Sequence, residues 1–309
     1  MRNIGQDITH ELNKSNYRER LQQMKEEVLR DSDVRAFLHQ HESELTSNAI
    51  DRSLSKLYEY VQEKHRIETH QTPKFPNYYP RLIVNVNYID IEYVPTEEYL
   101  AKQAERERLE RVSLVQLPKD LHHATFDQFD QSDPARQNAL EAAVDFAEQV
   151  IANPGKFVQA PYFYGPFGVG KTYLLGAIAN AFAEHDIESV LIHYPTFVTS
   201  LKQSINDNTV QDRIDELLEA QILVIDDIGA EKNTAWERDE VLGVVLQGRM
   251  SEGRPTLFSS NFDMDDLEDH FAHSDHGQSH EPVKAGRIME RIRTLAREVE
   301  MGGRNRRYQ

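Results

Sequence analysis

The sequence predicts an α/β protein whose main domain is a parallel sheet with helices on both faces. One observation is a glycine-rich loop at 165–172, with an apolar stretch at 160–164 before it and a helix-like segment at 173–183 after it. A second is an apolar run at 222–225 that ends in two carboxylates. The third is the alternation of helix-like segments with strand-like segments beyond residue 134, the latter at 160–164, 190–193, 222–225 and 256–259. This alternation is typical of a parallel sheet.

The glycine-rich loop follows the pattern G-x-x-x-x-G-K-[ST]. Its glycines let backbone N–H groups turn toward a phosphate, and the helix that follows adds partial positive charge. Lys171 would reach the β- and γ-phosphates of a nucleotide, and Thr172 would hold Mg²⁺. An ordinary glycine-rich turn is the alternative, and the flanking strand and helix disfavour it. The predicted binding residues are Gly165, Pro166, Phe167, Gly168, Val169, Gly170, Lys171 and Thr172.

The run at 222–225 is continuous rather than alternating, which predicts a strand buried on both faces of the sheet. Asp226 and Asp227 then lie at its carboxyl end, where ligands of open α/β sheets bind. Asp226 would hold Mg²⁺ through its water shell, and Asp227 would polarise the water that attacks the γ-phosphate. An acidic turn after a buried strand is the alternative. Together with the loop, the pair favours nucleotide hydrolysis.

Three further features allow more than one interpretation. Asn261 ends a strand candidate at 256–259, and it could position water or form a turn. Arg287 and Arg291 are four residues apart on one helix face, where they could stabilise a transferring phosphoryl group or form a solvated basic face. The basic end at 302–307 could contact phosphate of a nucleotide or a nucleic acid, or be a frayed tail.

Composition narrows the class of protein. The 309 residues carry a net charge of −17, and residues 111–280 contain 11 basic and 28 acidic side chains. Such an acidic body argues against a protein that coats nucleic acid by itself. The absence of cysteine indicates a reducing compartment. With no long apolar run and no signal-like N-terminus, we expect a cytoplasmic protein without a membrane partner.

The chain is expected to contain a small, mainly helical N-terminal domain before the α/β domain. Residues 8–65 carry helical apolar stripes, and residues 82–94 are strand-like. Residues 269–282, with four histidines, are expected to form a mobile loop without a metal. The predicted division is an N-terminal domain at 1–105, a linker at 106–125 and an α/β domain at 126–309.

The order of these motifs resembles the AAA+ ATPases, and among them the bacterial replicative helicase loaders of the DnaC/DnaI family. The resemblance covers essentially the whole chain. Its most specific segments are 87–93, 165–172, 256–261, 287–292 and the Gly-Arg-Asn-Arg-Arg ending at 303–307.

The resemblance implies ATP and Mg²⁺ as cofactors, and an ATPase domain without a helical lid after residue 307. It assigns Lys171 and Thr172 to Walker A, and Asp226 and Asp227 to Walker B. It further implies Asn261 as sensor 1, Arg291 as arginine finger with Arg287 as the second choice, and Arg304 or Arg306 as sensor 2.

The implied function is ATP-dependent loading of the replicative DNA helicase onto single-stranded DNA, during primosome assembly at replication initiation or restart. The N-terminal domain would bind the hexameric, DnaB-type helicase, and the ATPase domain would self-associate and contact the DNA. ATP binding and hydrolysis would then act as an assembly switch. Two alternatives are a transposition helper ATPase of the IstB type and a nucleotide-binding adaptor without hydrolysis.

One feature departs from the family. Its members often carry a cysteine-rich zinc site near the position of Glu63–Pro80, and this chain has no cysteine. We therefore expect no zinc, and packing around Phe75, Tyr78 and Tyr79 in its place.

Overall fold

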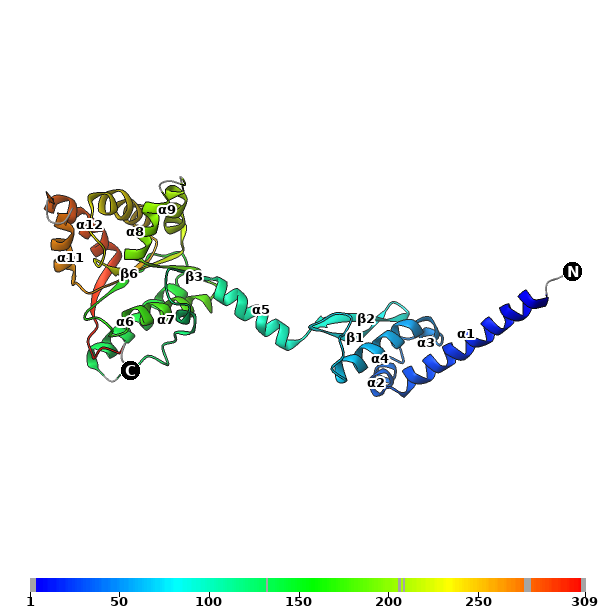
Figure 1. Ribbon diagram of the computed structural model, residues 1–309. Coiled ribbons are helices and arrows are strands. Elements are labelled where there is room, and N and C mark those ends of the chain that lie inside the picture. The colour runs from blue at the N-terminus through cyan, green and yellow to red at the C-terminus, as the bar shows by residue number, and fades with distance from the viewer. Residues whose placement is uncertain (1–3, 132, 205–206, 208, 275–278, 307–309) are drawn as a thin grey trace. The chain divides into compact units, whose positions relative to one another are not determined.

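The computed structural model describes residues 4–131, 133–204, 207, 209–274 and 279–306 (Figure 1). The chain divides into two compact units, Met1–Ala104 and Glu105–Gln309. Within the described ranges, no helix is long and apolar enough to cross a membrane.

The first unit packs helices on a two-stranded hairpin. Its core is formed by Val28, Val34, Leu54, Leu57, Tyr60, Leu82 and Ile89. Asp31 begins the second helix, because its carboxylate accepts hydrogen bonds from the backbone amides of Asp33 and Val34. The elements are α1 (Ile4–Arg30), α2 (Ser32–Gln40), α3 (Ala49–Arg52), α4 (Leu54–Glu68), β1 (Tyr78–Asn85) and β2 (Tyr88–Pro95).

The strand-like segment at 82–94 belongs to two antiparallel strands, because the chain turns back on itself within it. Asn85 pairs with Tyr88 in an antiparallel register, and Val86, at the turn, has a φ of 58°. A left-handed valine is uncommon, and no glycine or proline marks the turn. The apolar alternation that predicts a strand therefore runs through the turn without a break.

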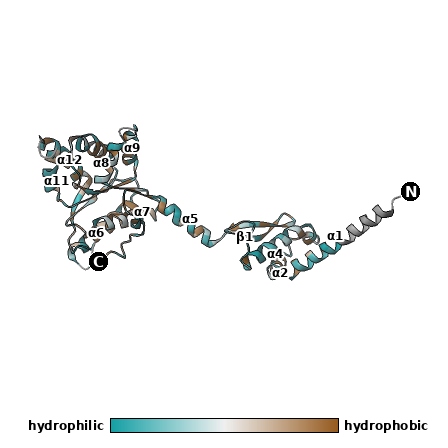
Figure 2. Cartoon of the chain, viewed as in Figure 1, coloured by the Kyte–Doolittle hydropathy of each residue, from teal (hydrophilic) through white to brown (hydrophobic). Residues whose placement is uncertain are grey.

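The segment expected to replace a zinc site is held by aromatic and ionic contacts. The Phe75 and Tyr93 rings lie 4.5 Å apart. The buried carboxylate of Glu63 accepts hydrogen bonds from the Lys74 amide at 2.7 Å and from Arg66 at 2.6 Å. Tyr78 meets Tyr99 of α5 (Glu97–Glu110), a largely hydrophilic helix (Figure 2) without buried residues.

The second unit contains a parallel sheet in the order β10-β4-β7-β6-β5-β3. Four of its strands, β4 to β7, lie where the sequence predicts them. The two outer strands were not predicted, and β3 lies inside the expected linker at 106–125, so the chain joins the sheet earlier than expected. The strands are β3 (Val112–Val115), β4 (Ala160–Tyr164), β5 (Ser189–His193), β6 (Ile222–Ile228), β7 (Thr256–Ser260) and β10 (Ala296–Glu300).

Helices cover both faces of this sheet, as the alternation predicts. Adjacent strand residues show the division: Tyr162 packs with one set of helices and Phe163 with the other. The face of Phe163 carries α6 (Pro134–Ala152) and α7 (Lys171–Ala183). The opposite face carries α8 (Tyr194–Gln203), α9 (Val210–Glu219), the π-helix η2 (Trp236–Leu242), α10 (Gly243–Ser251), α11 (Met264–Ala272) and α12 (Pro282–Leu295).

The expectation of a loop over 269–282 was wrong for most of its described residues. Helix α11 runs to residue 272, and a short pair of strands follows, β8 (His273–Ser274) and β9 (Ser279–His280). The helix persists because Asp263 caps it and Leu267 and Phe271 are buried. Residues 275–278 lie outside the described residues. A short turn, η1 (Lys119–His123), precedes α6, and residues 301–306 after β10 form neither helix nor strand.

Candidate nucleotide-binding site

The glycine-rich loop connects β4 to α7 at the carboxyl edge of the sheet. Gly165, Gly168 and Gly170 have φ values of 144°, 75° and 104°, which L-residues rarely adopt. At Gly165 a side chain would also collide with the Met301 carbonyl. The glycines are therefore required by the backbone path, and Lys171 and Thr172 begin the helix directly after it.

Lys171 places its buried ammonium group inside the turn of this loop. It donates hydrogen bonds to the carbonyl oxygens of Gly165 at 2.7 Å and Pro166 at 3.0 Å, and to Asn261 Oδ1 at 2.8 Å. Asn261 follows β7, so two segments predicted separately from the sequence meet at one cation. A phosphate entering the loop would meet this charge.

Asp226 lies beside the first turn of α7. Thr172 Oγ1 lies 3.0 Å from both carboxylate oxygens, and Ser259 Oγ donates to Oδ1 at 2.5 Å. Burial raises the pKa of the Asp226 carboxyl. A hydroxyl and a carboxylate side by side are the oxygen ligands that Mg²⁺ uses beside nucleotide phosphates, so these two residues fit the predicted ion.

Asp227 faces a different set of groups. Its Oδ1 accepts a hydrogen bond from Asn261 Nδ2 at 2.9 Å, and its Oδ2 lies 3.7 Å from His193 Nε2. The interaction with His193 lowers the pKa of Asp227, and the same interaction raises the pKa of His193. The φ of Asp227 is 57°, and its amide donates to Ser259 Oγ at 3.0 Å. These contacts favour the ionised form of the carboxylate.

A cavity of about 580 Å³ joins these groups. Its volume is in the range of cavities that hold small-molecule ligands. It is lined by Gln116, Leu117, Pro118, Phe167, Gly168, Gly170, Lys171, Thr172, His193, Thr196, Asp226, Asp227, Ser259, Asn261 and Arg306.

The end of the described chain runs along the loop. Met301 N donates to Tyr164 O at 2.8 Å, and Arg306 N donates to Gly168 O at 3.0 Å. The Arg306 side chain pairs with Asp130 and lines the cavity. Of the two residues considered for sensor 2, Arg306 is therefore at the cavity, whereas Arg304 is exposed and is not part of its lining.

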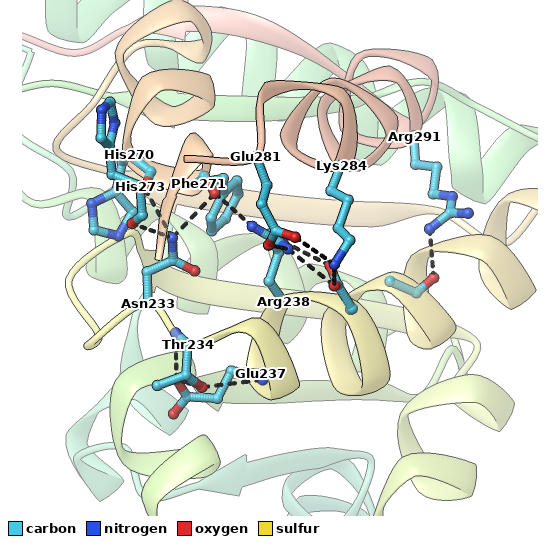
Figure 3. A network of polar contacts seen from close by, with 12 residues as sticks. Asn233, Thr234, Glu237, Arg238, His270, Phe271, His273, Glu281, Lys284 and Arg291 are labelled. Carbon is cyan, nitrogen blue, oxygen red and sulfur yellow. Dashed lines mark hydrogen bonds and ion pairs between the residues drawn. The ribbon is translucent and has the colours of Figure 1, made fainter. Parts of the chain in front are cut away.

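The candidate arginine fingers lie elsewhere, on α12. Arg291 Nη1 donates to Gly243 O at 3.0 Å (Figure 3). Arg287 is exposed, and neither residue lines the cavity. The structure therefore does not bring these arginines to the phosphate loop of the same chain.

A polar network holds α12 against the π-helix (Figure 3). The fully buried Arg238 pairs with Asp239 and Glu281, both at 2.7 Å, and donates to Phe271 O at 3.0 Å. Lys284 bridges the same two carboxylates at 3.1 and 2.7 Å. This network, with the buried Arg238 at its centre, fixes the orientation of the helix that carries Arg291.

Sequence reasoning missed Ser259, His193 and Arg136. His193 ends β5 and Ser259 is the last residue but one of β7, so the rule that ligands bind at the carboxyl ends of strands could have indicated both. Arg136 donates to Val169 O in the loop, and no sequence pattern near Arg136 indicates this contact. In the described part of the chain, no group of three or more His, Cys, Asp or Glu side chains could hold a metal ion.

The fold and the loop define a P-loop ATPase domain of the AAA+ class. The family model described as the bacterial DnaA ATPase domain matches residues 121–272, and the model described as the N-terminus of primosomal protein DnaI matches residues 1–93. The chain is 41% identical to the replicative helicase loader DnaI of Bacillus subtilis, over all of both chains. It belongs to the DnaI family of replicative helicase loaders.

Other relatives are more distant. The replicative helicase loader DnaC of Escherichia coli is 25% identical over 152 residues, which are 48% of this chain and 60% of DnaC. A crystal structure of DnaI matches with a TM-score of 0.55 and 39% identity, over 65% of this chain and 100% of that one. A crystal structure of the DnaC helicase loader, at 20% identity and a TM-score of 0.50, supports the fold alone.

Proposed function

We propose that this protein loads the hexameric, DnaB-type replicative helicase onto single-stranded DNA in an ATP-dependent step of primosome assembly, at replication initiation or restart. The observation that carries the proposal is the convergence of Lys171, Thr172, Asp226, Asp227 and Asn261 on one cavity. This site occurs in a chain similar to DnaI over its full length. ATP binding and hydrolysis would act as the switch for assembly and release.

The residues divide the chemistry between them. Lys171 and the loop amides would bind the β- and γ-phosphates. Thr172 and Asp226 would hold Mg²⁺, which neutralises charge on the phosphates when it is bound. Asp227 would accept the proton of the attacking water, and Asn261 would orient that carboxylate through its hydrogen bond of 2.9 Å.

Two further parts of the proposal concern partners. The N-terminal unit would bind the helicase, since residues 1–93 match the model of the DnaI N-terminus. Arg291 would act on the nucleotide of a neighbouring copy, since it does not line the cavity of its own chain. Hydrolysis would then depend on self-association, and the DNA contact would be formed by the assembled ATPase domains.

The match at residues 1–93 favours a loader over a transposition helper of the IstB type. The pair Asp226 and Asp227 favours hydrolysis over a nucleotide-binding adaptor without turnover. Phosphate release from ATP, measured in the presence of helicase and single-stranded DNA, distinguishes a hydrolysing protein from an adaptor without turnover.

The decisive experiment measures transfer of the replicative helicase of the same organism onto closed-circular single-stranded DNA. The wild-type chain should form a complex with the helicase and load it in the presence of ATP. Lys171→Ala, which leaves the N-terminal unit intact, should still form the complex but fail to load the helicase. A wild-type chain that forms no complex with the helicase would reject the proposal.

A further inference from the structure

Arg136 occupies an unfavourable position for a cation. It lies in the first turn of α6, where Asp133 caps the helix by accepting from the Ala135 amide at 2.9 Å. Positive charge at a helix N-terminus opposes the helix dipole. The side chain is also only 3% exposed, and burial lowers its pKa. The helix dipole and burial therefore both disfavour a cation at this position.

The guanidinium group is held by carbonyl oxygens and a ring. Its Nη1 donates to Val169 O in the phosphate loop, and its Nε donates to Asp130 O at 2.6 Å. The guanidinium carbon lies 4.2 Å from the centroid of the Phe129 ring. The charge of the Asp133 carboxylate acts against the effect of burial on the Arg136 pKa.

The contact with Val169 determines how the loop presents its backbone. The carbonyl of Val169 and the amide of Gly170 belong to one rigid peptide plane and point in opposite directions across it. Because Arg136 binds the carbonyl, the N–H of Gly170 is turned away from Arg136. Gly170 lines the cavity, so this amide is available to a ligand there.

The charge of Arg136 also lies close behind the loop. A Cβ atom added to Gly170 would lie 3.4 Å from Arg136 Nη1, and one added to Gly303 would lie 3.2 Å from Arg136 Cδ. Asp130, whose carbonyl accepts from Arg136, pairs through its side chain with Arg306. The arginine thus connects the phosphate loop, the segment before α6 and the last described residues.

We propose that Arg136 is a positioning residue for phosphate binding. Its guanidinium holds the Val169–Gly170 peptide in the orientation that receives the phosphates of a nucleoside triphosphate, and adds positive charge behind the loop. The inference rests on the nucleotide site of the proposed function. It extends that site to a residue that touches the loop from outside the cavity.

The test compares Arg136→Met and Arg136→Lys with wild type and with Arg297→Met, an exposed cation on β10. Equilibrium titration with a fluorescent ATP analogue measures affinity, and circular dichroism measures folding. Arg136→Met should bind about 10- to 100-fold more weakly, the loss expected for hydrogen bonds from a charged group. Arg136→Lys, which keeps the charge but not the planar fork, should be intermediate, and Arg297→Met should bind like wild type.

A purely structural role would lower the melting temperature without changing the affinity of the folded protein. The phosphate-positioning role also predicts that KM for ATP rises while kcat at saturating ATP changes little. Wild-type affinity in folded Arg136→Met overturns the inference. If that variant does not fold, wild-type affinity in Arg136→Lys overturns it instead. Absence of ATP binding in the wild-type chain would reject the nucleotide site itself, a different outcome.

Discussion

The phosphate loop and the α12 arginines were both predicted to act on ATP, but only the loop lies at the nucleotide cavity of its own chain. Around the loop, residues from β4, α7, β6 and β7 meet within hydrogen-bond distance, as Lys171 and Asn261 do at 2.8 Å. On α12, Arg291 instead donates to the Gly243 carbonyl, and Arg287 faces solvent. A single chain brings the groups around the phosphate loop together, whereas the arginines of α12 lie outside the cavity of that chain.

This difference indicates that nucleotide binding and the stimulation of hydrolysis depend on different parts of the molecule. Binding requires only groups that one chain brings together. An arginine that lies outside the cavity can act only on another copy, or after a rearrangement of α12. The network of Arg238, Glu281 and Lys284 opposes such a rearrangement, because it fixes α12 on the π-helix. We therefore expect Arg291 to act between copies of the chain.

The largest expected effect concerns Asp227. Asp227→Asn removes the group proposed to accept the proton of water, so hydrolysis should fall by up to about 10⁴-fold, the upper range for a general base. Affinity for ATP should change little, since the phosphate-binding groups remain. Steady-state phosphate release and equilibrium titration measure the two quantities. Asp212→Asn, on the exposed face of α9, is the control, and a loss of affinity in Asp227→Asn would contradict the assigned role.

Arg291→Ala should have a smaller effect, restricted to the assembled state. We expect a fall of about 10³-fold in the hydrolysis stimulated by helicase and DNA, as for a missing arginine finger, with unchanged ATP affinity. Arg287→Ala is the matched comparison on the same helix and should keep most of the stimulated rate. The opposite ranking of the two variants would reassign the finger to Arg287.

Lys171→Ala should weaken ATP binding by roughly 100-fold, because a charge-assisted contact with phosphate is worth about 3 kcal/mol. Lys156→Ala, an exposed lysine of the same unit, should bind normally. Isothermal titration measures both. Tight binding in Lys171→Ala would show that the loop is not the phosphate site, and the contrast between the loop and the α12 arginines would no longer hold.

The smallest effect concerns Glu231, in the segment between β6 and the π-helix that connects the two regions. Burial raises the pKa of this carboxyl from 4.5 to about 7. Between these values the unfolded chain loses its proton while the folded chain keeps it, so stability falls as the pH rises. Glu231→Gln should be more stable than wild type by about 3 kcal/mol at pH 8, and no more stable below pH 4.5.

Urea unfolding of both proteins across this pH range gives the difference directly, since other titrating groups cancel. The Gly229 amide, which donates to Glu231 at 2.8 Å, keeps an acceptor in Glu231→Gln. A stability difference that does not change with pH would show that Glu231 is ionised when folded.

The sequence could predict the inner strands and the loop because their patterns are local. Ile222–Ile225 is continuously apolar, and its burial on both faces follows directly. The edge strand β10 has no such apolar pattern in the sequence, because Arg297, Glu298 and Glu300 face solvent. The contact of Arg136 with Val169 joins residues 33 positions apart, so no spacing rule could have found it.

The most direct test of the account mixes two inactive variants. Asp227→Asn keeps Arg291 but lacks its own catalytic carboxylate, and Arg291→Ala has an intact nucleotide site but lacks the arginine. If Arg291 acts on a neighbouring copy, mixing them with helicase and single-stranded DNA should restore phosphate release well above either variant alone. Release that stays at the level of the separate variants, although the two are shown to associate, would place Arg291 at its own site and contradict the account.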